Sequence, residues 1–350
     1  ILEEAATEGA YYLINEARKC YMEYYAQKGI WDAYSYKETQ EECFALHIYV
    51  KGWHGENQIA YPVEGGNLYF DKDTGAVTGC DSDVTKADIP EQIARVKVTK
   101  IGAEAFDYCY SLTDITIPSG VESIAEDAIL TCPELQSIHV DEANAHFFGD
   151  TAGSLFNKDG SELLRCPNAY KGEYTVPDQV ASISAYAFYD CRKLEGIRLE
   201  GVRSIGKEAF ARCTRILSVE IPAEVEQIGE AAFLGCSSLT GIWVDEENAY
   251  FCNDEVGALF SKDKTRLLQF PCGYEGEYEI PDCVQTIAPK SFAYCGSLRM
   301  VSLPESLTRI GESAFYSCAA LTELTIPENV TYIGDFAFCE CYRLSKVFFM

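Results

Sequence analysis

One twelve-residue phrase recurs along the chain and limits its fold more than any other feature. It reads IGAEAFDYCYSL at residues 101–112 and IGEAAFLGCSSL at residues 228–239. Its spacing is mostly 22 or 23 residues, in the range of leucine-rich solenoids, where each turn buries its apolar side against its neighbours. The full form, I-G-x-x-A-F-x-x-C-x-x-L-x-x-I-x-I-P, starts at Ile101, Ile124, Ile183, Ile205, Ile228, Ile287, Ile310 and Ile333.

Each part of the phrase predicts a local structure. The L-x-x-I-x-I part alternates apolar residues and predicts a short strand. The proline that follows, as at Pro118 or Pro222, ends that strand because proline cannot donate to a ladder. The A-F-x-x-C part predicts a short helix or 3₁₀ turn. The predicted fold class is therefore α/β: a leucine-rich-repeat solenoid over residues 66–350 with a parallel β-sheet on its concave face.

Two intervals of 59 residues, from Ile124 to Ile183 and from Ile228 to Ile287, interrupt this rhythm. They hold similar inserts at about 140–177 and 244–281, and residues 101–200 align with residues 205–304 without a gap. Within the inserts, SLFNKDGSELLRC and ALFSKDKTRLLQF predict hairpins that project from the solenoid. Upstream, residues 66–93 predict a capping hairpin and a degenerate first turn, since a solenoid end needs a cap.

Residues 1–65 differ from the repeats and predict a small N-terminal α+β unit of unknown type. Apolar positions up to Gly29 have near-helical spacing, and CFALHIYVKG at 43–52 alternates as a strand. The segment QIAYPV would supply a second short strand to this unit.

Sixteen cysteines would ordinarily suggest disulfides or metal sites, but their positions favour packing. Eight occupy the same slot of the repeat, which predicts a buried ladder of small apolar side chains. Among the others, Cys252 could pair with Cys272 and Cys20 with Cys43. The ladder positions are Cys109, Cys132, Cys191, Cys213, Cys236, Cys295, Cys318 and Cys341.

The formal net charge is −27, from 55 acidic and 28 basic residues. Such a surface repels phosphate backbones and anionic headgroups, which disfavours nucleic acid and membrane-surface partners. No apolar stretch approaches the roughly 18 residues that a membrane span needs.

The recurring A-F-x-x-C and I-x-I-P elements resemble the leucine-rich repeats of the BspA-like surface proteins over about residues 66–350. The L-F-x-K-D hairpin with its Y-x-I/V-P return is also similar to segments of that family. The resemblance implies a secreted or cell-surface bacterial protein that adheres to host matrix, other bacteria or glycans. It implies no catalytic residue and no cofactor.

The middle residue of each I-x-I strand points outward and is the usual binding position in horseshoe-type solenoids. Trp243 stands out as a candidate anchor because tryptophan and arginine are enriched at binding hot spots. The alternative is that the adjacent hairpin covers Trp243. The candidate binding residues are His139, Arg198, Glu220, Trp243, Arg299 and Ser302.

Two other patterns hint at chemistry. Carboxylates at Asp71, Asp73, Asp81 and Asp83 could converge on calcium, although a hairpin turn at Gly75 explains the first pair. A thiol hydrolase built on Cys43, His47 and His54 fails on distance, because Cys43 and His47 would lie about 13 Å apart along a strand.

Three functions follow as hypotheses. The first is a non-catalytic module that binds a surface protein or glycan on the strand face. The second is an assembly protein that forms homo-oligomers through its C-terminal end or N-terminal helix. The third is an enzyme in residues 1–65 with the solenoid as a targeting arm.

Overall fold

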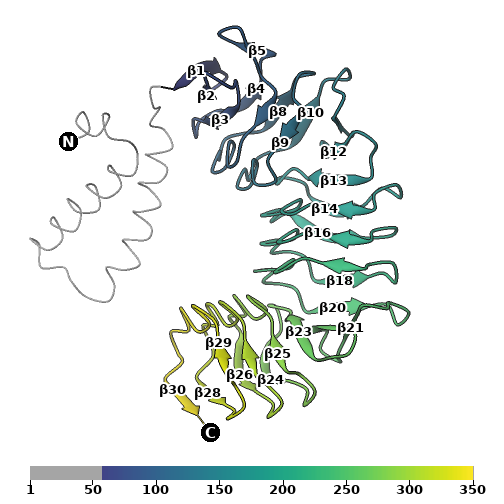
Figure 1. The fold of residues 1–350 in the computed structure, drawn as a ribbon, viewed down its shortest axis with the longest axis vertical. Coiled ribbons are helices and arrows are strands. Elements are labelled where there is room, and N and C mark those ends of the chain that lie inside the picture. Colours follow the sequence, from purple (N-terminus) through teal and green to yellow (C-terminus); the bar gives the residue numbers. More distant parts are fainter. Residues whose placement is uncertain (1–56, 350) are drawn as a thin grey trace, which may run out of the picture.

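The computed structural model describes residues 57–349, which form turns stacked along an open arc (Figure 1). The predicted N-terminal helix, the strand at 43–52 and the pair Cys20–Cys43 lie outside the described residues. The segment QIAYPV forms β1 (Gln58–Val63), which pairs antiparallel with β2 (Gly66–Asp71). This strand therefore joins the first segment of the solenoid, across the boundary drawn at residue 65.

The L-x-x-I-x-I segments form one row of strands, here called the strand row. Its sheets are β10-β8-β4, β14-β16, β18-β20, β24-β26 and β28-β30, all with parallel pairing. The members are β4 Lys86–Asp88, β8 Asp114–Ile117, β10 Ser137–Val140, β14 Gly172–Thr175, β16 Leu194–Arg198, β18 Ser218–Ile221, β20 Gly241–Val244, β24 Gly276–Glu279, β26 Leu298–Ser302, β28 Glu323–Ile326 and β30 Lys346–Phe349.

A second row consists of two-residue parallel strands that end at the first isoleucine of each repeat, here called the short-strand row. Its members are β7 Lys100–Ile101, β9 Ser123–Ile124, β15 Ser182–Ile183, β17 Ser204–Ile205, β19 Gln227–Ile228, β25 Thr286–Ile287, β27 Arg309–Ile310 and β29 Tyr332–Ile333. The small hairpin β5 Gln92–Ile93 and β6 Val96–Lys97 lies outside both rows.

Three antiparallel units of three strands interrupt the short-strand row. In each unit the register between the second and third strands shifts at the same place: Tyr69/Phe70, Leu155/Phe156 and Leu259/Phe260. The units are β1–β3, β11–β13 and β21–β23, with β3 Val77–Cys80, β11 Phe147–Gly149, β12 Leu155–Asn157, β13 Glu162–Arg165, β21 Phe251–Asn253, β22 Leu259–Ser261 and β23 Arg266–Gln269. The capping hairpin is therefore a third copy of the insert.

Each unit begins a block of the solenoid: block 1 is β1–β10, block 2 is β11–β20 and block 3 is β21–β30. Three clusters of buried apolar side chains follow these blocks. The predicted hairpins form, as the antiparallel pairs β12–β13 and β22–β23. They do not project from the solenoid, because the third strand of each unit continues the short-strand row. Thus β13 pairs parallel with β15, and β23 pairs parallel with β25.

The A-F-x-x-C segments, here called turn segments, are successive turns, and no helix occurs between residues 57 and 349. The α part of the predicted fold class is wrong for this part of the chain. Most segments hold two residues at positive φ, as at Glu208 (50°) and Arg212 (63°), which a helix does not allow. Their N–H groups bond to the next turn, as from Phe210 to the carbonyl of Ala232 at 2.8 Å.

The repeated phenylalanines stack inside the solenoid. The rings of Phe188 and Phe210 lie 5.0 Å apart, and those of Phe210 and Phe233 lie 5.3 Å apart, each pair nearly parallel. The ladder cysteines are buried beside them. Five of their thiols face the carbonyl oxygen of the phenylalanine one turn earlier, as from Cys213 to Phe188 at 3.1 Å. The cysteine therefore packs and also satisfies a buried carbonyl.

Two cysteine assignments differ from the sequence-based ones. Cys109, predicted as a free member of the ladder, forms a disulfide with Cys80. Cys252 and Cys272, which the sequence allowed as a possible pair, are both free. Instead, the Sγ atom of Cys272 lies 3.4 Å from that of Cys295.

A buried asparagine forms the corner where each insert leaves the strand row. Asn144 donates to the carbonyls of Pro118 and Val121 and accepts from the N–H groups of His146 and Phe147. The corresponding Asn248 makes equivalent bonds in block 2. The lysines of the L-F-x-K-D segments, Lys158 and Lys262, donate to the carbonyls of these asparagines. The L-F-x-K-D motif therefore has a structural role: its lysine stabilises the corner that the asparagine forms.

Candidate binding faces

The outward positions of the strand row lie in register on paired strands. Glu220 is opposite Trp243, and Thr116 is opposite His139. Among residues 57–349, no ladder joins β10 to β14, β16 to β18, β20 to β24 or β26 to β28. The row is therefore a series of short parallel sheets, interrupted both between and within blocks, and does not form the one continuous concave sheet that the sequence suggested.

Trp243 is the large aromatic side chain in the middle of this row, and it is 41% exposed. A Cβ atom on Gly241 would meet the indole at 2.7 Å, so the indole lies against Gly241 of its own strand. Gly257 of the following unit lies against the backbone of Gly241. A Cβ atom built on Gly257 would lie only 2.5 Å from the Cα atom of Gly241. Glycine at both positions lets the insert and the indole pack on one strand.

His139 occupies the corresponding position of the duplicated segment and makes polar contacts instead. Its Nε2 atom lies 2.8 Å from the hydroxyl of Ser137 and 3.6 Å from the carboxylate of Asp114. Burial alone would raise the pKa of Asp114, but bonds from Thr113 and Ser137 together with nearby His139 lower it. The same place in the fold is therefore polar in block 1 and aromatic in block 2.

Arg198, predicted as a positive point of contact, is already paired. Its Nε donates to Glu173 Oε1 at 2.9 Å, and its Nη2 lies 3.4 Å from Oε2. This contact raises the pKa of Arg198. Arg299 and Ser302 are exposed on β26, where Ser302 is opposite Glu279. Acidic groups thus dominate the row.

The four carboxylates considered as calcium ligands make hydrogen bonds to separate partners. Asp71 accepts from the N–H and hydroxyl of Thr74 at 2.7 Å, beside Gly75 at a φ of 69°. Asp81 accepts from Asn67 and from the hydroxyl of Tyr69, and burial together with Asp81 raises the pKa of Tyr69 to about 12. In the described part of the chain, no three acidic, histidine or cysteine side chains are arranged to hold a metal ion.

The thiol-hydrolase residues Cys43, His47 and His54 lie outside the described residues, so that hypothesis is not tested. No helix within residues 57–349 is long and apolar enough to cross a membrane.

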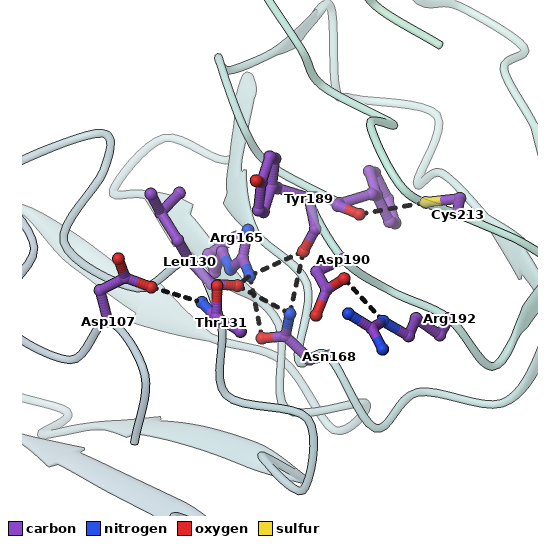
Figure 2. Close-up of polar contacts among 10 residues, drawn as sticks. Asp107, Leu130, Thr131, Arg165, Asn168, Tyr189, Asp190, Arg192 and Cys213 are labelled. Carbon is purple, nitrogen blue, oxygen red and sulfur yellow. Dashed lines mark hydrogen bonds and ion pairs between the residues drawn. The ribbon is translucent and has the colours of Figure 1, made fainter. Parts of the chain in front are cut away.

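The joint between blocks 1 and 2 holds a buried polar cluster (Figure 2). Arg165 is 3% exposed, and its guanidinium donates to the carbonyls of Leu130 (2.8 Å), Tyr189 (3.0 Å) and Tyr186. Asn168 accepts from Arg165 at 2.9 Å and itself donates to the carbonyls of Leu130 and Tyr189. These two side chains tie the last turn of block 1 to the first turn of block 2.

The joint between blocks 2 and 3 has the same backbone but different side chains. Gln269 and Cys272 stand where the first joint has Arg165 and Asn168. The amide nitrogen of Gln269 donates to the carbonyls of Ser291 (3.2 Å) and Phe270 (3.4 Å). An ion pair also crosses this joint between turn segments, from Lys290 Nζ to Glu208 Oε1 at 2.9 Å.

Sequence analysis did not identify the joints. A signal existed, because residues 101–200 and 205–304 align without a gap and differ at these buried positions. An arginine in place of a glutamine within an apolar hairpin indicates a change in what fills the core. The spacing pattern alone does not show that difference.

Comparison with known proteins identifies the repeats. A family model described as BspA type leucine rich repeat region matches in six copies, over residues 78–152, 168–257 and 272–350. The unmatched gaps contain strands β12–β13 and β22–β23 of the inserted units. No curated protein matches the sequence.

Three similar solved structures are bacterial. A leucine-rich repeat protein from Eubacterium ventriosum is 25% identical, over 83% of this chain and 72% of that chain, with a TM-score of 0.45. The pneumococcal vaccine antigen PcpA is 23% identical, over 85% and 81%, with a TM-score of 0.50, and this likeness supports the fold. A leucine rich cell surface protein from Faecalibacterium prausnitzii is 21% identical, over 83% and 94%, with a TM-score of 0.45.

Proposed function

The chain belongs to the BspA type leucine-rich repeat family, and on that premise we propose that it is a non-catalytic binding module of a secreted or cell-surface bacterial protein. The partner is a surface protein or a glycan of host or bacterial origin. It is held on the strand row of block 2, around Trp243.

One observation carries this proposal: the indole of Trp243 lies against Gly241 of its own strand and is 41% exposed. Aromatic rings supported in this way present a large contact area at a low entropic cost. Glu220 beside it and the Arg198–Glu173 pair two strands away supply polar groups around the ring. The arrangement suits a partner with an apolar or sugar face edged by hydrogen-bonding groups.

Binding to a panel of matrix proteins and glycans tests the proposal. We expect Trp243→Ala to weaken binding at least tenfold, since hot-spot truncations cost roughly 2 kcal/mol or more. His139→Ala is the matched control, because it changes the equivalent position of block 1. Equal binding by the wild type and Trp243→Ala would place the partner elsewhere.

A further inference from the structure

The first ladder cysteine of each block has a different neighbour from the rest. Five ladder thiols face the carbonyl oxygen of the phenylalanine one turn earlier: Cys132, Cys213, Cys236, Cys318 and Cys341. The other three begin the ladders of blocks 1, 2 and 3: Cys109, Cys191 and Cys295. The turn before each of these three belongs to an antiparallel unit, whose third strand ends at or near another cysteine. Each of the three lies beside that unit cysteine.

Blocks 1 and 3 contain this pair in two chemical states. In block 1 the unit cysteine is Cys80, and it forms a disulfide with Cys109. In block 3 it is Cys272, and its Sγ atom lies 3.4 Å from the Sγ atom of Cys295. Since a disulfide bond is about 2.05 Å long, these two sulfurs must come roughly 1.4 Å closer, which rotation about the two Cα–Cβ bonds can supply. The thiols of block 3 are therefore placed to form the bond that block 1 already has.

The two thiols of block 3 are enclosed once the turns have stacked. Cys272 is 4% exposed, and Cys295 is fully buried. Burial raises the pKa of the Cys295 thiol well above its ordinary value, because a buried thiolate would lose its hydration. Thiol–disulfide exchange proceeds through the thiolate. A bond between these sulfurs therefore has to form while the chain folds, before the pair is buried.

The pair lies at the joint between blocks 2 and 3. Gly273, next to Cys272, donates its N–H to the carbonyl of Leu239 in block 2 at 2.8 Å. A bond from Cys272 to Cys295 would fix to block 3 the segment that meets block 2. In the reduced protein this joint holds the neutral amide of Gln269 with a pocket of about 220 Å³ beside it, where the first joint has a buried guanidinium.

We propose that Cys272 and Cys295 form a disulfide that closes the second joint in the exported protein. The thiolate of one cysteine attacks a small disulfide of the medium, such as cystine, and releases one thiol. The thiolate of the other cysteine attacks this mixed disulfide and releases the second thiol, so the S–S bond of the oxidant is exchanged for that of the protein. The oxidising medium rests on the proposed secreted or surface location.

Refolding of the whole chain with cystine tests the pairing. Free thiols are blocked with N-ethylmaleimide, and the unreduced protein is cut with trypsin and a glutamate-specific protease, which separates Cys272 from Cys283. We expect mass spectrometry to show a linked peptide pair that holds Cys272 and Cys295, and that disappears when a reductant is present throughout. Cys236 and Cys318, the ladder thiols of the adjacent turns, are the matched controls and should carry the maleimide. Maleimide on both Cys272 and Cys295 after refolding with cystine, or a link from Cys272 to Cys236, would overturn the proposal.

Amide exchange tests what the bond does at the joint. The N–H of Phe270 should exchange at least about tenfold more slowly in the oxidised than in the reduced protein, because the cross-link restricts local opening. Cys295→Ser should abolish this difference, whereas Cys252→Ser, a free cysteine of the same block, should keep it. Equal exchange in the two forms of the wild type would show that the bond does not close the joint.

Protein taken from the producing cells separates the pairing from the location. The linked peptide should be present there as well as after refolding with cystine. A link that forms only with cystine would contradict the proposed export, while its absence under both conditions would contradict the pairing. Loss of partner binding in Trp243→Ala should leave the linked peptide unchanged.

Discussion

The two joints of the solenoid share one backbone and differ in what fills them. At the first, Arg165 and Asn168 bind the carbonyls of Leu130 and Tyr189 and close the junction with charge-assisted hydrogen bonds. At the second, Gln269 and Cys272 occupy the same positions, and a pocket opens beside Gln269. The corners at Asn144 and Asn248, in contrast, are the same in both.

This difference shows which positions a duplicated solenoid can vary. A corner asparagine must satisfy four backbone groups at once, and few other side chains can do so. A joint needs only a filled volume and paired carbonyls, which several side chains can supply. New chemistry can therefore arise at a joint while the stacked turns on either side keep their packing.

The largest expected effect is at the first joint. Arg165→Ala should lower the free energy of unfolding by about 3–5 kcal/mol, because the carbonyls of Leu130, Tyr186 and Tyr189 each lose a charge-assisted hydrogen bond. Gln269→Ala, the matched change, should cost about 1–2 kcal/mol. Urea denaturation measures both. Equal losses would mean that the two joints are energetically alike.

Loss of the corner asparagine should lower the free energy of unfolding by a similar amount in the two blocks. Asn144→Ala and Asn248→Ala should each cost about 3 kcal/mol, since each leaves buried N–H and carbonyl groups unpaired. The same denaturation series measures them. A difference between the two much above 1 kcal/mol would show that identical bonds have different worth in the two blocks.

A smaller effect is expected at the ion pair across the second joint. Burial alone would lower the pKa of Lys290, but the hydrogen bond that its ammonium group donates to the Glu208 carboxylate raises it above its ordinary 10.5. Because the pKa is higher in the folded than in the unfolded protein, the ion pair stabilises the fold fully at pH values below the pKa of the unfolded state. This contribution is lost as the pH rises through the pKa of the folded state. Lys290→Met should therefore cost up to about 1 kcal/mol at pH 7.

The control for this pair is its pH dependence. Stability of the wild type relative to Lys290→Met should fall as the pH rises above 10.5. A difference that stays constant over this range would show that the methylene chain of Lys290, and not its charge, holds the joint.

The smallest effect concerns thiol reactivity. Burial raises the pKa of Cys236 and Cys295, so these ladder thiols should resist alkylation in the folded protein. Cys283 is exposed and free and should react first among residues 57–349. Mass spectrometry after brief treatment with a maleimide gives the order in which the cysteines are modified. Early modification of Cys295 would indicate that the second joint opens readily.

The repeats, the strands of the strand row and the burial of the ladder cysteines could be predicted because each depends on a local pattern read once per turn. The short helix or 3₁₀ turn predicted for A-F-x-x-C is not found in residues 57–349, where these segments are successive turns. Their residues at positive φ and their bonds to the next turn, as from Phe210 to Ala232, depend on stacking that one turn does not show. The duplicated segment and its two inserts were predicted, but β1–β3 was not recognised as a third copy because it resembles the inserts in fold more than in sequence.

The candidate site was predictable only in part. Alternation along the strand places Trp243 outward, but its support by Gly241 depends on a glycine two residues earlier and on Gly257 of the insert. The pairing of Arg198 with Glu173 depends on which strands become neighbours. The pocket beside Gln269 depends on the side chain that fills the joint, which only the comparison with Arg165 reveals.

Hydrogen exchange at two equivalent amides tests the central comparison most directly. The N–H of Cys166 bonds to Ala187 and that of Phe270 bonds to Ser291, both at 2.8 Å. If Arg165 closes the first joint and the second is left open, the amide of Phe270 should exchange at least tenfold faster, a difference of about 1.4 kcal/mol in opening. Equal protection of the two amides would contradict the account.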